Sequence, residues 1–154
     1  MKNANTDTAP LVKNITVPWP VDEAFRRFTD GIGHWWPLAT HSVLKEKEKV
    51  TACAFEAKVG GRIYETGESR ETSLWGTVIA VEAPSMVRFT WHPGREPDTA
   101  QEVEVRFSAH EDGTRVVLTH SGWDKLGKAA AATRKDYDSG WDFVLAHYTE
   151  SAPR

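Results

Sequence analysis

The sequence predicts an α+β domain in which one C-terminal helix packs against a curved antiparallel sheet. Residues 50–121 divide into six short β-type segments, separated by turn residues such as Gly60-Gly61 and Asp112-Gly113. After them comes an apolar stripe at spacing i, i+4, i+7, i+8 and i+11, the spacing of one helix face: Tyr137, Trp141, Val144, Leu145 and Tyr148. Because one amphipathic helix closing on a curved sheet tends to enclose a cavity, we expect a fold that binds a ligand.

The N-terminal part predicts a tail, a strand and a helix. Residues 1–10 are polar and are expected to be a disordered tail, and residues 11–150 to form a single domain. We expect the first strand at residues 11–18 and a helix at residues 21–28, which Pro20 and an acidic first turn favour. A short helix or turn should then carry Trp35 and Trp36.

The middle of the chain predicts an exposed loop followed by the rest of the sheet. Residues 39–49 are rich in Lys and Glu, which is typical of a solvated segment. The strand pattern is clearest at residues 101–107, where apolar and charged side chains alternate. We place the six remaining strands at residues 50–58, 62–67, 74–82, 86–92, 101–109 and 114–121. The closing helix should span residues 136–149, with Gly140 allowing close approach to the sheet or opening space beneath Trp141.

Composition excludes several function classes. The net charge of −3 and the pI near 6.1 argue against nucleic acid as the main partner. No apolar run is long enough for a membrane span. The one cysteine, Cys53, allows no intrachain disulfide, so we expect a cytoplasmic protein. The six histidines show no HxH or HExxH spacing and no phosphate-binding glycine motif is present, so we expect neither a metal nor a cofactor.

An ordered set of short segments is similar to a known superfamily. The segments are Val17 to Phe28, Trp35-Trp36, Val59-Gly60-Gly61-Arg62, Gly76-Thr77-Val78, Val87-Arg88-Phe89-Thr90-Trp91, Gly113-Thr114, Thr119-His120-Ser121-Gly122-Trp123 and Gly140-Trp141. In this set the chain resembles the START-like, or SRPBCC, superfamily with its helix-grip (Bet v 1-like) fold. Within it, the chain resembles the AHSA1-like branch, homologous to the activator of Hsp90 ATPase. The resemblance implies seven antiparallel strands gripping a long C-terminal helix, two short helices after the first strand, and an elongated cavity between sheet and helix.

The inward sheet positions and the facing helix supply the expected ligand-binding residues. We expect the cavity wall to comprise Phe55, Tyr64, Phe89, Trp91, Val105, Phe107, Leu118, His120, Trp141 and Leu145, with Trp35 and Trp36 near the entrance. The alternative is that these side chains simply fill the core. His120 is either a general acid or base or a core histidine satisfied by its neighbours. Glu65 either points inward, to bind a ligand donor or act as a base, or faces solvent.

Three classes of function follow from these expectations. The favoured one is the binding of a small, largely apolar molecule, driven by burial of its surface. Members of the superfamily bind lipids, hormones and polyketides, and some catalyse cyclisations or dehydrations. The resemblance therefore also implies a cyclase-type or hydrolase-type enzyme, or a co-chaperone that contacts an Hsp90-type protein. We favour binding over catalysis, and a homodimer is a further expectation.

Overall fold

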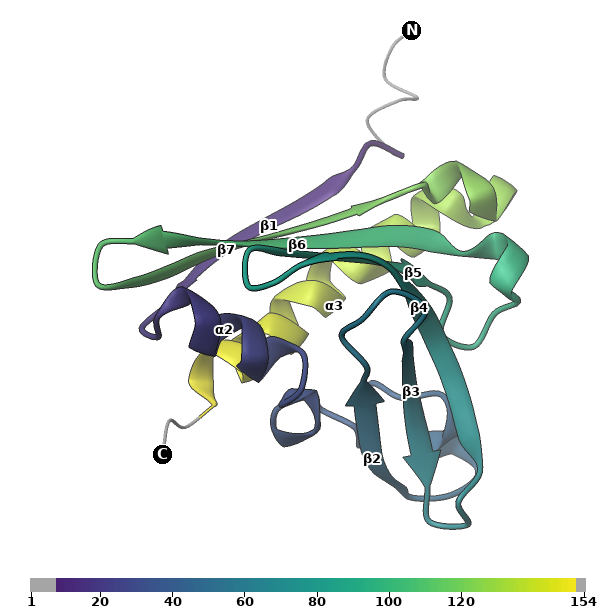
Figure 1. Ribbon diagram of the computed structural model, residues 1–154. Coiled ribbons are helices and arrows are strands. Elements are labelled where there is room, and N and C mark those ends of the chain that lie inside the picture. Colours follow the sequence, from purple (N-terminus) through teal and green to yellow (C-terminus); the bar gives the residue numbers. More distant parts are fainter. Residues whose placement is uncertain (1–7, 152–154) are drawn as a thin grey trace, which may run out of the picture.

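Seven antiparallel strands form one sheet in the order β1-β7-β6-β5-β4-β3-β2, which curls around the long helix α3 (Figure 1). The computed structural model describes residues 8–151. The strands are β1 (Leu11–Val17), β2 (Val50–Phe55), β3 (Arg62–Gly67), β4 (Thr72–Glu82), β5 (Met86–Trp91), β6 (Gln101–His110) and β7 (Gly113–Ser121). The helices are α2 (Val21–Phe28) and α3 (Ala130–Glu150), with short 3-10 helices η1 (Ile32–His34), η2 (Leu44–Glu46), η3 (Pro97–Thr99) and η4 (Trp123–Ala129). The predicted α+β helix-grip architecture is confirmed.

The curl of the sheet has local causes in β2, β3 and β4. The register shifts between Val50 and Ala52, between Ile63 and Tyr64, and between Val78 and Ala80. Such bulges bend a strand and increase its twist. Gly76 lies on β4, where an added Cβ would come within 1.7 Å of the Thr90 carbonyl oxygen. The result, visible in Figure 1, is that β2 and β3 turn away from the direction of β6 and β7.

Helix α3 is anchored through its apolar stripe and through two ion pairs. Trp141, Val144, Leu145 and Tyr148 are all buried, as the spacing predicts. On β1, Lys13 contacts Asp138 at 2.5 Å and Asp142 at 2.9 Å. The Tyr148 hydroxyl also donates to the backbone oxygen of Ala24 on α2 at 2.7 Å. These contacts fix α3 against β1 at the middle of the helix and against α2 near its C-terminal end.

Two segments differ from the sequence-based expectation. Helix α3 begins at Ala130 rather than at residue 136, because alanine favours helix formation. Gly127, with a φ of 59°, is not helical and separates α3 from the preceding turn. The loop at residues 39–49 is not simply solvated, because Leu44 is buried and η2 forms there. The backbone N–H groups of Val43 and Leu44 donate to Glu65 on β3, which holds the polar segment against the sheet.

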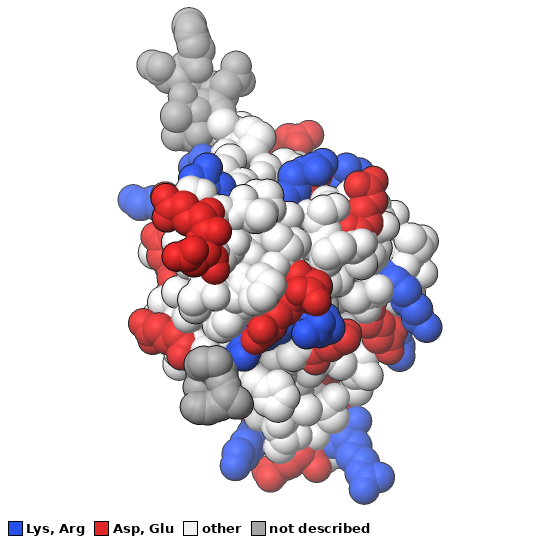
Figure 2. All heavy atoms as spheres, turned by 60° about the vertical axis from the view of Figure 1, so that its left-hand side comes forward, with Lys and Arg blue, Asp and Glu red and all other residues white. Residues whose placement is uncertain are grey.

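Residues 9 and 10, just before β1, lie against α3. The expected disordered tail falls largely on residues 1–7, outside the described residues, while the backbone oxygen of Ala9 accepts a hydrogen bond from Arg134 on α3 at 2.6 Å. Within residues 8–151, no helix has the length and apolar character needed to cross a membrane. On the face shown in Figure 2, acidic and basic side chains are interspersed.

Candidate functional site

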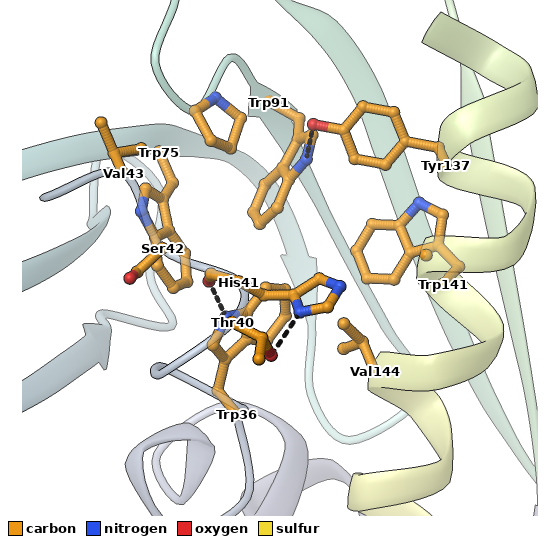
Figure 3. Close-up of a pocket in the computed structure, with 12 residues that line it drawn as sticks. Trp36, Thr40, His41, Ser42, Val43, Trp75, Trp91, Tyr137, Trp141 and Val144 are labelled. Carbon is orange, nitrogen blue, oxygen red and sulfur yellow. Dashed lines mark hydrogen bonds between the residues drawn. The ribbon is translucent and has the colours of Figure 1, made fainter. Parts of the chain in front are cut away.

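A cavity of about 220 Å³ lies between α3, the ends of β4 and β5, and the loop at residues 37–43 (Figure 3). It is partly open to solvent, and its wall is mainly apolar. The residues around it are Trp36, Thr40, His41, Ser42, Val43, Trp75, Trp91, Pro93, Tyr137, Gly140, Trp141 and Val144. No Lys, Arg, Asp or Glu is among them. Gly140 opens space here, because an added Cβ would meet no heavy atom within 4 Å.

Four tryptophans form most of the aromatic wall. Trp36 is central, with its ring centroid 4.9 Å from that of Trp75, 6.0 Å from that of Trp91 and 6.1 Å from that of Trp141. Trp91 and Trp141 are 5.7 Å apart. At these separations the rings pack against one another as well as lining the space. The wall is therefore closely packed as well as apolar.

Each of the four indole N–H groups donates to an acceptor within the protein. In chain order of the tryptophans, the acceptors are the His41 backbone oxygen at 2.7 Å, Glu65 Oε1 at 2.5 Å, the Tyr137 hydroxyl at 3.2 Å and His120 Nδ1 at 3.0 Å. An indole has only this one donor. The tryptophans therefore offer a ligand their ring surfaces and no spare hydrogen bond.

Glu65 is fully buried and holds the loop at residues 37–43 to the sheet. Its Oε1 accepts the backbone N–H of Val43 at 2.7 Å, in addition to the Trp75 indole, and its Oε2 accepts the backbone N–H of Leu44 at 2.7 Å. Three donors replace the water that the carboxylate loses on burial. Glu65 does not line the cavity, and its oxygens face the protein rather than a ligand.

His120 is also fully buried, behind Trp141 rather than at the cavity surface. Its Nδ1 accepts from Trp141, its Nε2 lies 3.1 Å from Gln101 Oε1, and its ring stacks on Trp123 with centroids 4.0 Å apart. Burial lowers the pKa of His120 to about 3. The structure thus matches the core-histidine alternative: a neutral ring with both nitrogens satisfied.

Of the side chains expected to line a cavity, Trp36, Trp91 and Trp141 do so. The others belong to the core or to the sheet away from it. Trp35, Phe55, Phe89, Val105, Phe107, Leu118 and Leu145 are buried core residues. Tyr64 is partly buried on β3, with the Arg62 guanidinium 5.2 Å from its ring centroid.

Several lining residues were missed by sequence reasoning. Tyr137 and Val144 belong to the apolar stripe of α3, and Trp75 to a predicted strand, so their patterns held a usable signal. The loop residues at 40–43 gave no such signal, because a polar segment is normally solvated. Their position depends on Glu65, which lies more than twenty residues away in the chain.

His41 lies at the cavity and contacts α3. Its ring stacks on that of Phe143, with centroids 4.9 Å apart and planes within 16°, and its Nδ1 is 2.8 Å from Thr40 Oγ1. Burial, with smaller effects of His147 and Lys45, lowers the pKa of His41 below its ordinary value. The ring is therefore mainly neutral at pH 7. Among the described residues, no group of three His, Cys, Asp or Glu side chains is placed to hold a metal ion.

The sequence matches the model of one known protein family. The sequence model described as "Activator of Hsp90 ATPase homolog 1-like protein" (AHSA1) matches residues 18–147. The chain belongs to the AHSA1 family. No curated protein matches it significantly.

Solved structures share the fold of this AHSA1-family domain. Protein MLL2253 from Mesorhizobium loti is 16% identical, with a TM-score of 0.61, over 92% of this chain and 94% of that chain. The Aha1 dimer from Colwellia psychrerythraea is 15% identical, with a TM-score of 0.67, over 93% and 95%. The anthrahydroquino-γ-pyrone synthase Txn09, solved in complex with a molecule designated SUM, is 29% identical, with a TM-score of 0.57, over 94% and 88%.

Proposed function

We propose that this AHSA1-family domain binds a small, largely apolar aromatic molecule in the cavity between α3 and the sheet. The observation that carries the proposal is the wall of four tryptophans whose indole N–H groups are all used within the protein. Such a wall gains little from a polar ligand and much from a flat apolar one.

The volume limits the size of the ligand. A closed apolar cavity of about 150 Å³ accommodates benzene, so about 220 Å³ suits a molecule of one or two fused rings. Burial of roughly 200 Å² of apolar surface contributes about 5 kcal/mol, which corresponds to sub-millimolar affinity before the costs of association.

The seven tryptophans provide a test with an internal control. In a ¹H–¹⁵N correlation spectrum, titrated naphthalene should shift the indole signals of Trp36, Trp75, Trp91 and Trp141, which line the cavity. The signals of Trp19, Trp35 and Trp123 should move much less, because these residues lie outside it. Uniform shifts across all seven signals, or no saturable shift, would contradict the proposal.

A pair of variants on α3 sharpens this test. Gly140→Leu places a side chain in the open space beside the cavity and should abolish the shifts. Ala146→Leu makes a comparable addition at an exposed position of the same helix and should leave them unchanged. Equal binding by both variants would place the ligand elsewhere on the molecule.

A cyclase-type reaction is a second candidate, favoured by the 29% identity to the γ-pyrone synthase over 94% of the chain. Its test is incubation with a linear poly-β-ketone thioester and mass-spectrometric detection of a cyclised, dehydrated product. Gly140→Leu serves as the blocked control. A product yield equal to that of the buffer or of Gly140→Leu argues against catalysis in this cavity.

The family description motivates a third candidate, contact with an Hsp90-type chaperone. It predicts a faster chaperone ATPase rate when the domain is added at micromolar concentration. An unchanged rate, with no co-elution of the two proteins, removes this candidate. The same chromatography, coupled to light scattering, tests the homodimer that the Colwellia relative suggests.

A further inference from the structure

One hydroxyl group at the cavity has an uncommitted hydrogen. Tyr137 extends from α3, and Figure 3 shows its hydroxyl beside the Trp91 indole nitrogen. That nitrogen donates to the phenol oxygen at 3.2 Å, so the phenol is the acceptor in this bond. A tyrosine hydroxyl also carries its own hydrogen. Within residues 8–151, no acceptor receives it.

The other hydroxyl and indole donors at the cavity are already engaged. Ser42 Oγ donates to the Leu38 backbone oxygen at 2.7 Å, and Thr40 Oγ1 lies 2.8 Å from His41 Nδ1. The four indole groups have the partners given above. Among the described residues that line the cavity, Tyr137 is therefore the side chain, apart from the His41 ring, whose donor hydrogen has no acceptor within the protein.

The surroundings of Tyr137 keep its hydroxyl protonated. Burial raises the pKa of Tyr137 above its ordinary value of about 10, although its hydrogen bond from Trp91 and the charge of Arg95 oppose the shift. At neutral pH the group therefore donates a hydrogen bond and is not a phenolate. No cationic or anionic side chain lines the cavity, and Arg95 acts on Tyr137 from outside that lining. A charged ligand would therefore lose its water without an ion partner in the cavity wall.

We propose that Tyr137 donates its hydroxyl hydrogen to a carbonyl oxygen of a neutral aromatic ligand, so that the site selects an aromatic ketone over a hydrocarbon of the same shape. This inference rests on the proposed function and narrows it from apolar molecules in general to aryl ketones. The apolar wall supplies affinity, and the single donor sets orientation and selectivity.

The test compares two ligands of the same shape. Acetophenone and α-methylstyrene differ in one group, C=O against C=CH₂. The ratio of their dissociation constants is measured by the same ¹H–¹⁵N titration in the wild-type protein and in Tyr137→Phe. Because water solvates the two ligands differently, only the change of this ratio between proteins is informative. One net hydrogen bond should change it by about 3- to 10-fold in favour of the ketone in the wild type.

A tyrosine elsewhere on the same helix provides the matched control. Tyr148→Phe also removes a hydroxyl that is hydrogen-bonded within the protein, to the Ala24 backbone oxygen, but Tyr148 does not line the cavity. Its ligand ratio should equal that of the wild type. A change of similar size in Tyr148→Phe would overturn the inference, because it would trace selectivity to general loosening of α3.

The remaining outcomes separate this inference from the proposed function. If both ligands bind and their ratio is the same in wild type and Tyr137→Phe, the role of Tyr137 is overturned and the binding function stands. If neither ligand binds the wild type, both are overturned. Should Tyr137→Phe fail to fold, the carbonyl stretch of ¹³C-labelled acetophenone bound to the wild type decides. A frequency below that in an apolar solvent supports the bond, and an unchanged frequency overturns it.

Discussion

Trp141 donates its indole N–H to Nδ1 of His120 at 3.0 Å, and this one bond determines the state of the histidine. An indole nitrogen is only a donor, so Nδ1 must be unprotonated. The hydrogen of the neutral ring is then on Nε2, which donates to Gln101 Oε1 at 3.1 Å. The Gln101 amide nitrogen donates in turn to the Thr99 backbone oxygen at 2.8 Å, which fixes the orientation of the amide. His120 therefore supports the cavity wall from behind.

Acid should destabilise the protein through His120. The pKa of the buried ring is lowered to about 3, whereas the unfolded chain has an ordinary histidine pKa of about 6.5. Below pH 6.5 His120 binds a proton in the unfolded state but not in the folded state. The free energy of unfolding is therefore highest above pH 6.5 and decreases as the pH falls. Between pH 7 and pH 5 this group should lower the free energy of unfolding by about 2 kcal/mol.

Urea denaturation at pH 7, 6 and 5 measures this loss. His120→Gln should show a smaller loss over the same interval, while the exposed-site control His34→Gln should behave like the wild type. An equal pH dependence in all three proteins would contradict the assignment to His120.

Replacing Glu65 should loosen the cavity wall. In Glu65→Gln one carboxylate oxygen is replaced by an NH₂ group, which is a donor. That NH₂ group then points at another donor, which is the N–H of Val43, Leu44 or the Trp75 indole. A buried donor left without an acceptor costs about 1–3 kcal/mol. We expect this decrease in the free energy of unfolding, together with faster amide exchange at Val43 and Leu44.

A surface carboxylate gives the comparison for Glu65. Glu71 is exposed and pairs with Lys47 at 3.0 Å. Glu71→Gln should change stability by less than about 1 kcal/mol, because solvent screens such pairs. Similar losses for the two variants would argue against a special role of the buried carboxylate.

The same substitution at two glycines should have opposite effects. Gly140→Ala should stabilise the protein by about 0.5–1 kcal/mol, because the position is helical and an added Cβ meets nothing within 4 Å. Gly76→Ala should destabilise it strongly, because the Cβ would lie 1.7 Å from the Thr90 oxygen. Thermal unfolding of both variants measures the difference. A lower melting temperature for Gly140→Ala would mean that the space beside α3 is filled.

Cys53 should react slowly with thiol reagents. Burial, with the nearby charge of Glu65, raises the pKa of its thiol to about 12. Since the thiolate is the reactive form, its population at pH 8 is about 10³-fold below that of an ordinary thiol. Labelling with a disulfide reagent should be slow in the native protein and rapid in urea, with glutathione as the reference. Native labelling as fast as that of glutathione would contradict this burial.

Local patterns predicted most of the fold. The i, i+4, i+7 spacing identified the buried face of α3. Turn residues on either side placed a strand at residues 62–67, the bounds of β3, and alternation helped to place residues 101–109 within a residue of β6. These features depend on side chains near one another in sequence, and helix and strand periods translate them directly into faces. The start of α3 was placed too late, because the alanine-rich residues before it show no apolar period.

The sequence by itself determined the α+β architecture, the family and the buried stripe of the closing helix. Only the tertiary structure decided which polar groups work at the cavity. Glu65 meets the backbone of Val43, and His120 meets Trp141, across more than twenty residues in each case. The fate of a polar side chain depends on the partners that folding brings to it, because a buried donor or acceptor is stable only when paired. Periodicity does not show which partners a side chain meets. It therefore could not predict that Glu65 and His120 form hydrogen bonds within the protein, while the hydrogen of the Tyr137 hydroxyl has no acceptor among the described residues.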